Sequence, residues 1–225
     1  MQRASKQITE QQRRRVDQAV AEAEAKTSAE IIPVVATASG RYDRAEDIIG
    51  LWFSVATVIA LWLWLPRASD EPGTWSGISL PWQILILIVA MVLAFIVGAA
   101  VGSAVGWLRR LFTPRAEMRD DVAARAREAF FDNRIHHTAD ATGLLFYISL
   151  YERMAAVIAD QQVIDELGQS FLDELCDELT SRLRAGHPTD ALCTVLSAAG
   201  QRLAAVLPRA ADDVNELPDT LVVMD

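Results

Sequence analysis

The sequence predicts a small layered α/β domain of three to four strands with flanking helices, interrupted by a two-helix transmembrane hairpin. Two stretches contain no charged residue, 18 residues at 48–65 and 29 residues at 80–108. Apolar runs of strand length stand on both sides of this pair, at Ile31–Ala36 before it and at 144–150 and Met154–Ala159 after it. Together these observations indicate one sheet whose strands are separated in sequence by the hairpin.

Both uncharged stretches are long enough to cross a bilayer. A helix needs about 20 residues to cross a hydrocarbon core of ~30 Å, so the first stretch suffices narrowly and the second easily. All six tryptophans lie between residues 48 and 108: Trp52, Trp62, Trp64, Trp75, Trp82 and Trp107. Four of them, Trp62, Trp64, Trp82 and Trp107, stand near the stretch ends, where indole rings favour the headgroup boundary. A buried hairpin in a soluble core is the alternative, but buried core helices seldom contain more than about 14 uninterrupted apolar residues.

The flanks of the hairpin together make one domain of ordinary size. Residues 1–47 are too few for a stable core of their own, and residues 109–225 supply the rest. Two crossings return the chain to its starting side, as such a domain requires. The sequence before residue 48 has no apolar region, so we expect the first span, rather than a cleavable signal peptide, to direct insertion.

Basic residues predict the orientation. The loop at 66–79 holds one basic residue, Arg67, against Asp70 and Glu71, whereas six arginines flank the hairpin on the domain side: Arg41, Arg44, Arg109, Arg110, Arg115 and Arg119. Cytoplasmic flanks carry the excess of Lys and Arg. We therefore expect a multi-pass protein of the inner membrane with both termini in the cytoplasm, and contact between these arginines and anionic lipid.

The net charge of −9 argues against a nucleic-acid-binding protein. Cys176 and Cys193 belong to no metal or redox motif, and we expect them to act as small apolar helix residues.

The remaining elements follow from local signals. Thr9 and Gln12 fit a capping box that begins a helix extending to about Lys26. Pro33 within the first strand favours an edge position, a strand start or a bulge, because proline has no N–H to donate. After the hairpin we expect a helix at 117–133, a hairpin of the two later strands, two amphipathic helices, and a tail that docks as a short strand.

Small residues recur every four positions in the second span, ending in a doubled G-x-x-x-G: Ala90, Ala94, Gly98, Gly102 and Gly106. This spacing lets another backbone approach closely. The partner is either Gly50 and Ser54 of the first span or a second copy of the chain, and chance enrichment of glycine in a membrane helix is the third reading.

The strands resemble a known family. T-S-A-E-I-I-P-V-V at 27–35 is similar to the first strand of the TPM domain, and T-G-L-L-F-Y-I-S-L-Y-E-R at 142–153 with V-I-A-D at 157–160 is similar to its next two strands. The match is to the bacterial membrane branch, in which two transmembrane helices interrupt the domain. The chain departs from that pattern at Asp140–Gly143, where a basic residue is usual, and at Asp160–Val163, where a glycine is usual.

The resemblance implies a sheet-and-helix domain, tied to photosystem II repair in plastids and to membrane proteins in bacteria. Acid phosphatase activity and divalent cation binding are proposed for some members of the family. The missing glycine after the third strand weakens the case for a preserved active loop.

The best acidic set consists of Glu30, Glu152 and Asp160, all at strand ends. Carboxylate oxygens suit hard cations, so the cofactor that such a set would take is Ca²⁺ or Mg²⁺. The alternative is three solvated strand-end carboxylates, with Glu152 paired to Arg153 or another arginine. His136 and His137 offer a general base or a metal ligand, but adjacent histidines in a loop usually point apart, which favours a structural role.

These observations favour a membrane-tethered interaction module over an enzyme. The module would present its cytoplasmic domain to a membrane protein, or to a second copy, as an assembly factor for a membrane complex. The alternative function is a divalent-cation-dependent phosphatase that uses Glu30, Glu152 and Asp160.

Overall fold

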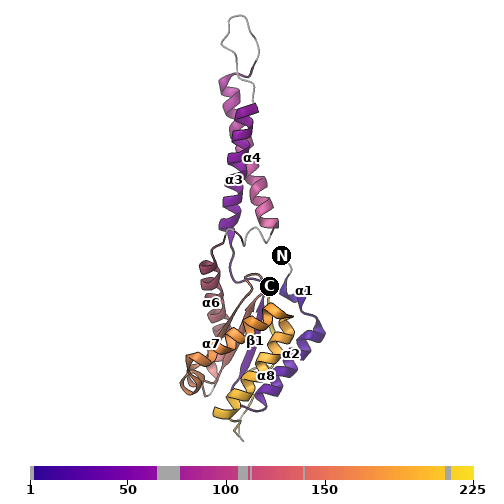
Figure 1. The fold of residues 1–225 in the computed structure, drawn as a ribbon, viewed down its shortest axis with the longest axis vertical. Coiled ribbons are helices and arrows are strands. Elements are labelled where there is room, and N and C mark those ends of the chain that lie inside the picture. The colour runs from indigo at the N-terminus through magenta and orange to yellow at the C-terminus, as the bar shows by residue number, and fades with distance from the viewer. Residues whose placement is uncertain (1–2, 65–76, 106–110, 112, 139, 211–213) are drawn as a thin grey trace, which may run out of the picture. The chain divides into compact units, whose positions relative to one another are not determined.

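The computed structural model describes residues 3–64, 77–105, 111, 113–138, 140–210 and 214–225, with only the backbone at 43–45. Its elements form two compact units (Figure 1). The domain unit combines Gln2–Gly40 with Ala116–Asp225, and the hairpin unit contains Arg41–Arg115. The domain is therefore built from chain segments on either side of the hairpin.

The domain has a mixed α/β architecture, which confirms the predicted fold class in its coarse form. Its elements in chain order are α1 (Ala4–Gln7), α2 (Glu10–Glu24), β1 (Ile31–Ala36), α6 (Arg115–Asp132), the 3₁₀ turn η1 (Ile135–His137), β2 (Leu144–Ser149), β3 (Met154–Ala159), α7 (Gln161–Ala185), α8 (Pro188–Val206) and β4 (Val222–Met224). α7 contains a break at Gly168, whose φ is 77°.

The strands make one sheet in the order β3-β2-β1-β4. β1 pairs in parallel with β2, from Ile31 opposite Leu144 to Ala36 opposite Ser149, and in parallel with β4. β2 and β3 form an antiparallel hairpin. β1, the strand before the two apolar helices, is thus a central strand between β2 and β4, which both follow those helices in the chain.

Pro33 lies inside this central strand, in contrast to the predicted edge, strand start or bulge. The carbonyls of Glu30 and Ala36 accept N–H groups from the β2 side, while the N–H of Thr37 donates to Met224 of β4. Alternate residues of β1 therefore direct their backbone groups to β4, and the nitrogen of Pro33 is among them. Pairing with β4 begins only at Val34, so the missing N–H of Pro33 interrupts no ladder.

Both faces of the sheet are covered, which gives a three-layer domain (Figure 1). Side chains of β1 alternate between the layers, as the two-residue period of a strand requires. Ile31 and Val35 pack with α2, α7 and α8 in one core, and Ile32 and Val34 pack with α6 in the other.

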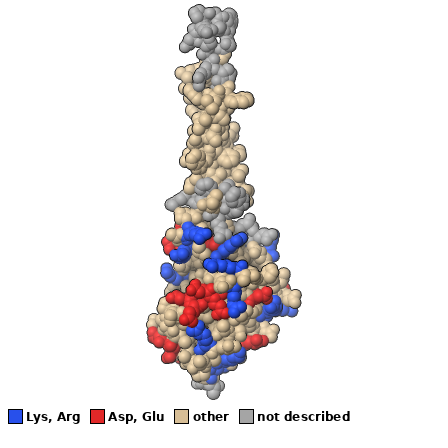
Figure 2. Space-filling view, viewed as in Figure 1, with Lys and Arg blue, Asp and Glu red and all other residues tan. Residues whose placement is uncertain are grey.

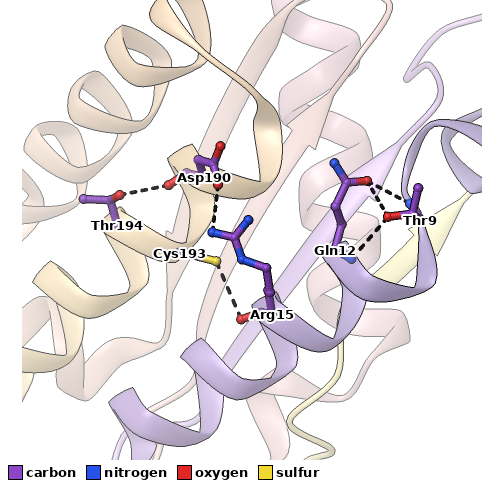
Figure 3. A network of polar contacts seen from close by, with 6 residues as sticks. All are labelled: Thr9, Gln12, Arg15, Asp190, Cys193 and Thr194. Atoms are coloured by element: carbon purple, nitrogen blue, oxygen red, sulfur yellow. Dashed lines mark hydrogen bonds and ion pairs between the residues drawn. The ribbon is translucent and has the colours of Figure 1, made fainter.

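Helix α2 begins at the predicted capping box and packs beside α8 (Figure 3). The hydroxyl of Thr9 accepts the N–H of Gln12, whose side-chain oxygen accepts the N–H of Thr9 at 2.8 Å. Across the helix pair, Arg15 forms an ion pair with Asp190 at 2.9 Å. This exposed ion pair joins α2 to α8, the last helix of the chain.

The hairpin unit consists of α3 (Asp43–Trp64) and α4 (Leu80–Ala104). Both contain stretches that are long and apolar enough to cross a membrane, Glu46–Trp64 and Leu80–Ala104. Some residues on which the membrane predictions rest lie outside the described residues, as does the end of the second predicted span: Trp75, Trp107, Gly106, Arg67, Asp70, Glu71, Arg109 and Arg110.

The glycines of α4 face α3. A Cβ added at Gly98 would lie 2.9 Å from the Cα of Gly50 and 2.8 Å from the Cβ of Phe53. The hydroxyl of Ser54 donates to the carbonyl of Met91 at 3.0 Å, while Ala94 is half-buried. The sequence left open whether this small-residue surface contacts the first apolar helix or a second copy of the chain. In the structure, Gly98 and Gly102 lie against α3 of the same chain.

Candidate functional site

Polar side chains gather where β1 and β2 end, at the carboxyl edge of the sheet. Glu152, in the turn after β2, is 1 % exposed. Its Oε1 accepts the N–H of Ser39 at 2.8 Å and that of Gly40 at 3.3 Å, and its Oε2 accepts the hydroxyl of Ser149. Glu152 thus secures the segment that follows β1.

A second pair extends this cluster toward α6. The hydroxyl oxygens of Ser39 and Tyr147 lie 3.0 Å apart. Burial raises the pKa of the Tyr147 phenol, and the nearby charge of Glu152 raises it further, while Ser39 and Arg125 oppose the shift. The phenol therefore stays protonated at neutral pH and can serve as a hydrogen-bond donor.

Glu30 and Asp160 lie at the opposite, amino edge of the sheet. Glu30 precedes β1, and its carboxylate accepts the N–H groups of Glu216 at 3.1 Å and Leu217 at 3.3 Å. Asp160 follows β3 and caps α7, with Oδ1 accepting the N–H of Gln161 at 2.8 Å. Its Oδ2 is buried and has no hydrogen-bond partner within the described chain.

The predicted cation site of Glu30, Glu152 and Asp160 requires correction. β1 and β2 are parallel, so a residue before β1 and a residue after β2 stand at opposite ends of the sheet. Six residues at about 3.3 Å each separate these ends by roughly 20 Å, too far for carboxylates to share one ion. Among the described residues no three acidic, His or Cys side chains form a metal-binding group.

A different carboxyl cluster stands near Glu30. Glu24, at the end of α2, is 8 % exposed, and its Oε1 accepts the N–H of Ile31 at 2.7 Å. With Glu30, Asp219 and Arg209 it lines a pocket of about 40 Å³. Its Oε2 is buried without a hydrogen-bond partner in the described residues.

Burial raises the pKa of Glu24 to about 9, against the opposing effect of the Ile31 N–H, and the charges of Asp219 and Glu30 add to the increase. Glu24 is therefore protonated at neutral pH. A neutral carboxyl suits this place because neighbouring carboxylates would repel a charged one.

The two histidines pack as aromatic groups. The ring of His136 lies 4.8 Å from that of Phe131 and 4.3 Å from that of His137. Phe131 itself is 60 % exposed. We call Phe131, His136 and His137 the aromatic patch. Nδ1 of His136 is buried and lacks a hydrogen-bond partner among the described residues, and no described acidic or cysteine group completes a metal set with it.

Both cysteines are half-buried and free. The Cys176 thiol donates to the carbonyl of Ala155, and the Cys193 thiol donates to that of Arg15 (Figure 3). Burial raises the pKa of each thiol, which disfavours the reactive thiolate.

The surface of the domain is strongly acidic along α7. Figure 2 shows Asp and Glu side chains gathered over this helix. The exposed acidic residues of α7 include Asp165, Glu166, Asp173, Glu174 and Asp177. This face would repel other acidic surfaces.

Comparison with known proteins reveals a likeness in fold. The NMR structure of the BA42 protein from the psychrophilic bacterium Bizionia argentinensis superimposes with a TM-score of 0.56 at 15 % identity, over 99 % of each chain. At that identity the likeness concerns the fold alone. No family model and no curated protein sequence matches this chain.

Sequence reasoning missed Glu24 and the contacts of Glu152. In the sequence, Glu24 stands at the end of an amphipathic helix, where a charged side chain is usually exposed to solvent. It becomes buried only because β1 packs beside the end of this helix. A faint signal existed, since Glu24 lies just C-terminal to the apolar stripe of Val16, Val20 and Ala23. The partners of Glu152 are backbone N–H groups, which no residue type reveals.

Proposed function

We propose that the protein is an integral membrane protein that presents a TPM-like domain in the cytoplasm of a bacterial cell, as an interaction or assembly module for a membrane complex. The observation that carries the proposal is the insertion of two apolar helices between β1 and β2, which are neighbours in the sheet. An insertion between two paired strands ties the domain to the bilayer through both of its chain segments and raises its local concentration near membrane partners.

The helices themselves support residence in a bilayer. Leu63 is 75 % exposed and Trp64 is 89 % exposed, and such side chains are costly in water but stable in lipid. The partner is either a membrane protein or a second copy of the chain, and the acidic surface disfavours nucleic acid.

The aromatic patch is the surface that best suits a protein partner. Phe131 projects from α6 with most of its ring exposed, and it is supported from behind by Phe130 and His136. Aromatic side chains held rigidly at a surface supply large contact area at low entropic cost, and they dominate many interfaces.

Two experiments test the proposal. In a background with Cys176 and Cys193 replaced by alanine, a Gly77→Cys variant should react with a membrane-impermeant maleimide on intact cells, whereas Ser5→Cys should react only after lysis. The reverse pattern would contradict a cytoplasmic domain.

The second experiment measures assembly. The protein solubilised in a mild detergent should elute as a defined complex, and Phe131→Ala should dissociate it while Ile59→Ala, at an exposed position of the apolar hairpin, should leave its protein composition unchanged. A monomeric wild-type protein with no stable partner would contradict the interaction-module proposal.

A further inference from the structure

A second cavity opens at the carboxyl edge of the sheet, on the side of α7 and α8. Its volume is about 340 Å³, and it lies between the end of β2, the start of β3, the last turns of α7 and the first residue of α8. Small-molecule sites occupy roughly 300–1,000 Å³, and in open α/β sheets they lie at the carboxyl ends of the strands. The size and position of this cavity are therefore those of a ligand site.

The cavity combines an apolar lining with a basic one. Leu150, Met154 and Leu183 contribute apolar side chains, and Thr180 contributes a hydroxyl. The charged side chains that line it are both basic, Arg153 and Arg184. In a chain of net charge −9 this local excess of positive charge selects an anion.

Neither arginine is committed to the fold. Arg153 and Arg184 form no hydrogen bond and no ion pair among the residues that the structure describes, whereas the neighbouring Arg182 pairs with Glu178 at 2.8 Å. A guanidinium has five N–H donors in a planar fork that matches a carboxylate or a phosphate. Both guanidinium groups at this cavity therefore keep their N–H donors available for an anion.

The backbone at Arg153 carries strain that a test can use. Arg153 ends the four-residue turn between β2 and β3 with a φ of 55°, in the left-handed region where glycine or asparagine fits without strain. A bulky arginine at this position costs stability, as it does at Arg134, which has the same φ.

We propose that this cavity binds an anionic amphiphile, with its carboxylate or phosphate head at Arg153 and Arg184 and the adjoining hydrocarbon against Leu150, Met154 and Leu183. The source we assign is an anionic membrane lipid. β1 ends at this same edge and continues through residues 37–42 into α3, the first of the two apolar helices. The lipid source rests on the membrane location proposed above, whereas anion binding at the two arginines requires no protein partner and is tested separately from the interaction-module function.

The test uses the full-length protein in a neutral detergent. Dioctanoyl phosphatidic acid has an anionic head and short chains, inorganic phosphate has the head alone, and dioctanoyl phosphatidylcholine has the same chains without net charge. Calorimetric titration should give a Kd for the phosphatidic acid at least tenfold lower than for either of the other two. Since each variant removes charge-assisted hydrogen bonds to the head group, Arg153→Gly or Arg184→Gln should weaken this binding roughly tenfold or more.

Arg134 provides the matched control, because it is exposed and also has a φ of 55° but does not line the cavity. Arg134→Gly and Arg153→Gly should both raise the melting temperature, and only the latter should lose the lipid. Equal binding of inorganic phosphate would overturn the lipid assignment in favour of a free anion. Equal binding of the phosphatidylcholine, or undiminished binding in an Arg153→Gly, Arg184→Gln double variant, would overturn the site.

Discussion

The backbone N–H of Ser39 donates to Oε1 of Glu152 across 2.8 Å, and this bond joins the segment after β1 to the turn after β2. The two residues are 113 positions apart in the sequence, with the apolar hairpin of α3 and α4 between them. The same carboxylate also accepts the N–H of Gly40 and the hydroxyl of Ser149, so three donors depend on one buried side chain.

Removing that carboxylate should destabilise the domain. Glu152→Ala leaves the half-buried N–H groups of Ser39 and Gly40 and the buried hydroxyl of Ser149 without this acceptor, and we expect the free energy of unfolding to fall by about 3 kcal/mol. Urea denaturation of the full-length protein in detergent, followed by far-ultraviolet circular dichroism, measures the change. Glu166→Ala on the exposed face of α7 is the control and should stay within about 0.5 kcal/mol of the wild type. Equal stability of the two variants would show that Glu152 is not a structural anchor.

Gly143, just before β2, should tolerate no side chain. A Cβ at this position would lie 2.4 Å from the carbonyl oxygen of Ile135 and 2.5 Å from its Cγ2, so the backbone of η1 would have to move. We expect Gly143→Ala to lower the free energy of unfolding by about 1–3 kcal/mol, as overpacked cores do.

Gly186→Ala is the matched control for this glycine. Gly186 has an extended backbone with a φ of −155°, and its added Cβ would meet no atom nearer than 3.9 Å. The melting temperature of the Gly186→Ala protein should equal that of the wild type. A Gly143→Ala protein that melts at the same temperature as the Gly186→Ala protein would refute the close contact with Ile135.

The strands and the two apolar helices could be predicted from the sequence because each rests on local composition and length. Whether Glu30 and Glu152 lie close together could not be predicted, because it depends on the relative direction of β1 and β2. Glu30 precedes β1 and Glu152 follows β2, and these positions meet only if the strands are antiparallel, whereas β1 and β2 are parallel. Likewise the burial of Glu24 depends on β1 and on Asp219, which is 195 residues further along the chain (219 − 24).

The protonated state of Glu24 makes stability depend on pH. The pKa of its side chain is about 9 in the folded protein, against 4.5 normally, so folding takes up a proton between these values. The contribution of this group to stability is full below about pH 4.5 and is lost as the pH rises toward 9, at up to about 1.4 kcal/mol per pH unit.

Glu24→Gln should remove this slope, since an amide keeps a carbonyl oxygen for the N–H of Ile31 and carries no charge. We expect the variant to gain stability over the wild type by roughly 1 kcal/mol per unit between pH 6 and pH 8, measured by urea denaturation at each pH. Glu22→Gln, an exposed carboxylate on the same helix, should give a difference that does not vary with pH. A constant difference for Glu24→Gln as well would mean that Glu24 is ionised in the folded protein.

The close approach of α3 and α4 should depend on Gly98. Its added Cβ would stand 2.8 Å from the Cβ of Phe53 and 2.9 Å from the Cα of Gly50, so Gly98→Leu must push the helices apart. The hydroxyl of Ser54 donates to the backbone carbonyl of Met91 across the same helix pair at 3.0 Å, and this contact should be lost with the close approach. We therefore expect Gly98→Leu to lower the melting temperature of the detergent-solubilised protein, measured by circular dichroism. Ala100→Leu, on an exposed position of α4, should leave it unchanged. An unchanged melting temperature in the Gly98→Leu protein would show that the glycine surface does not hold the hairpin together.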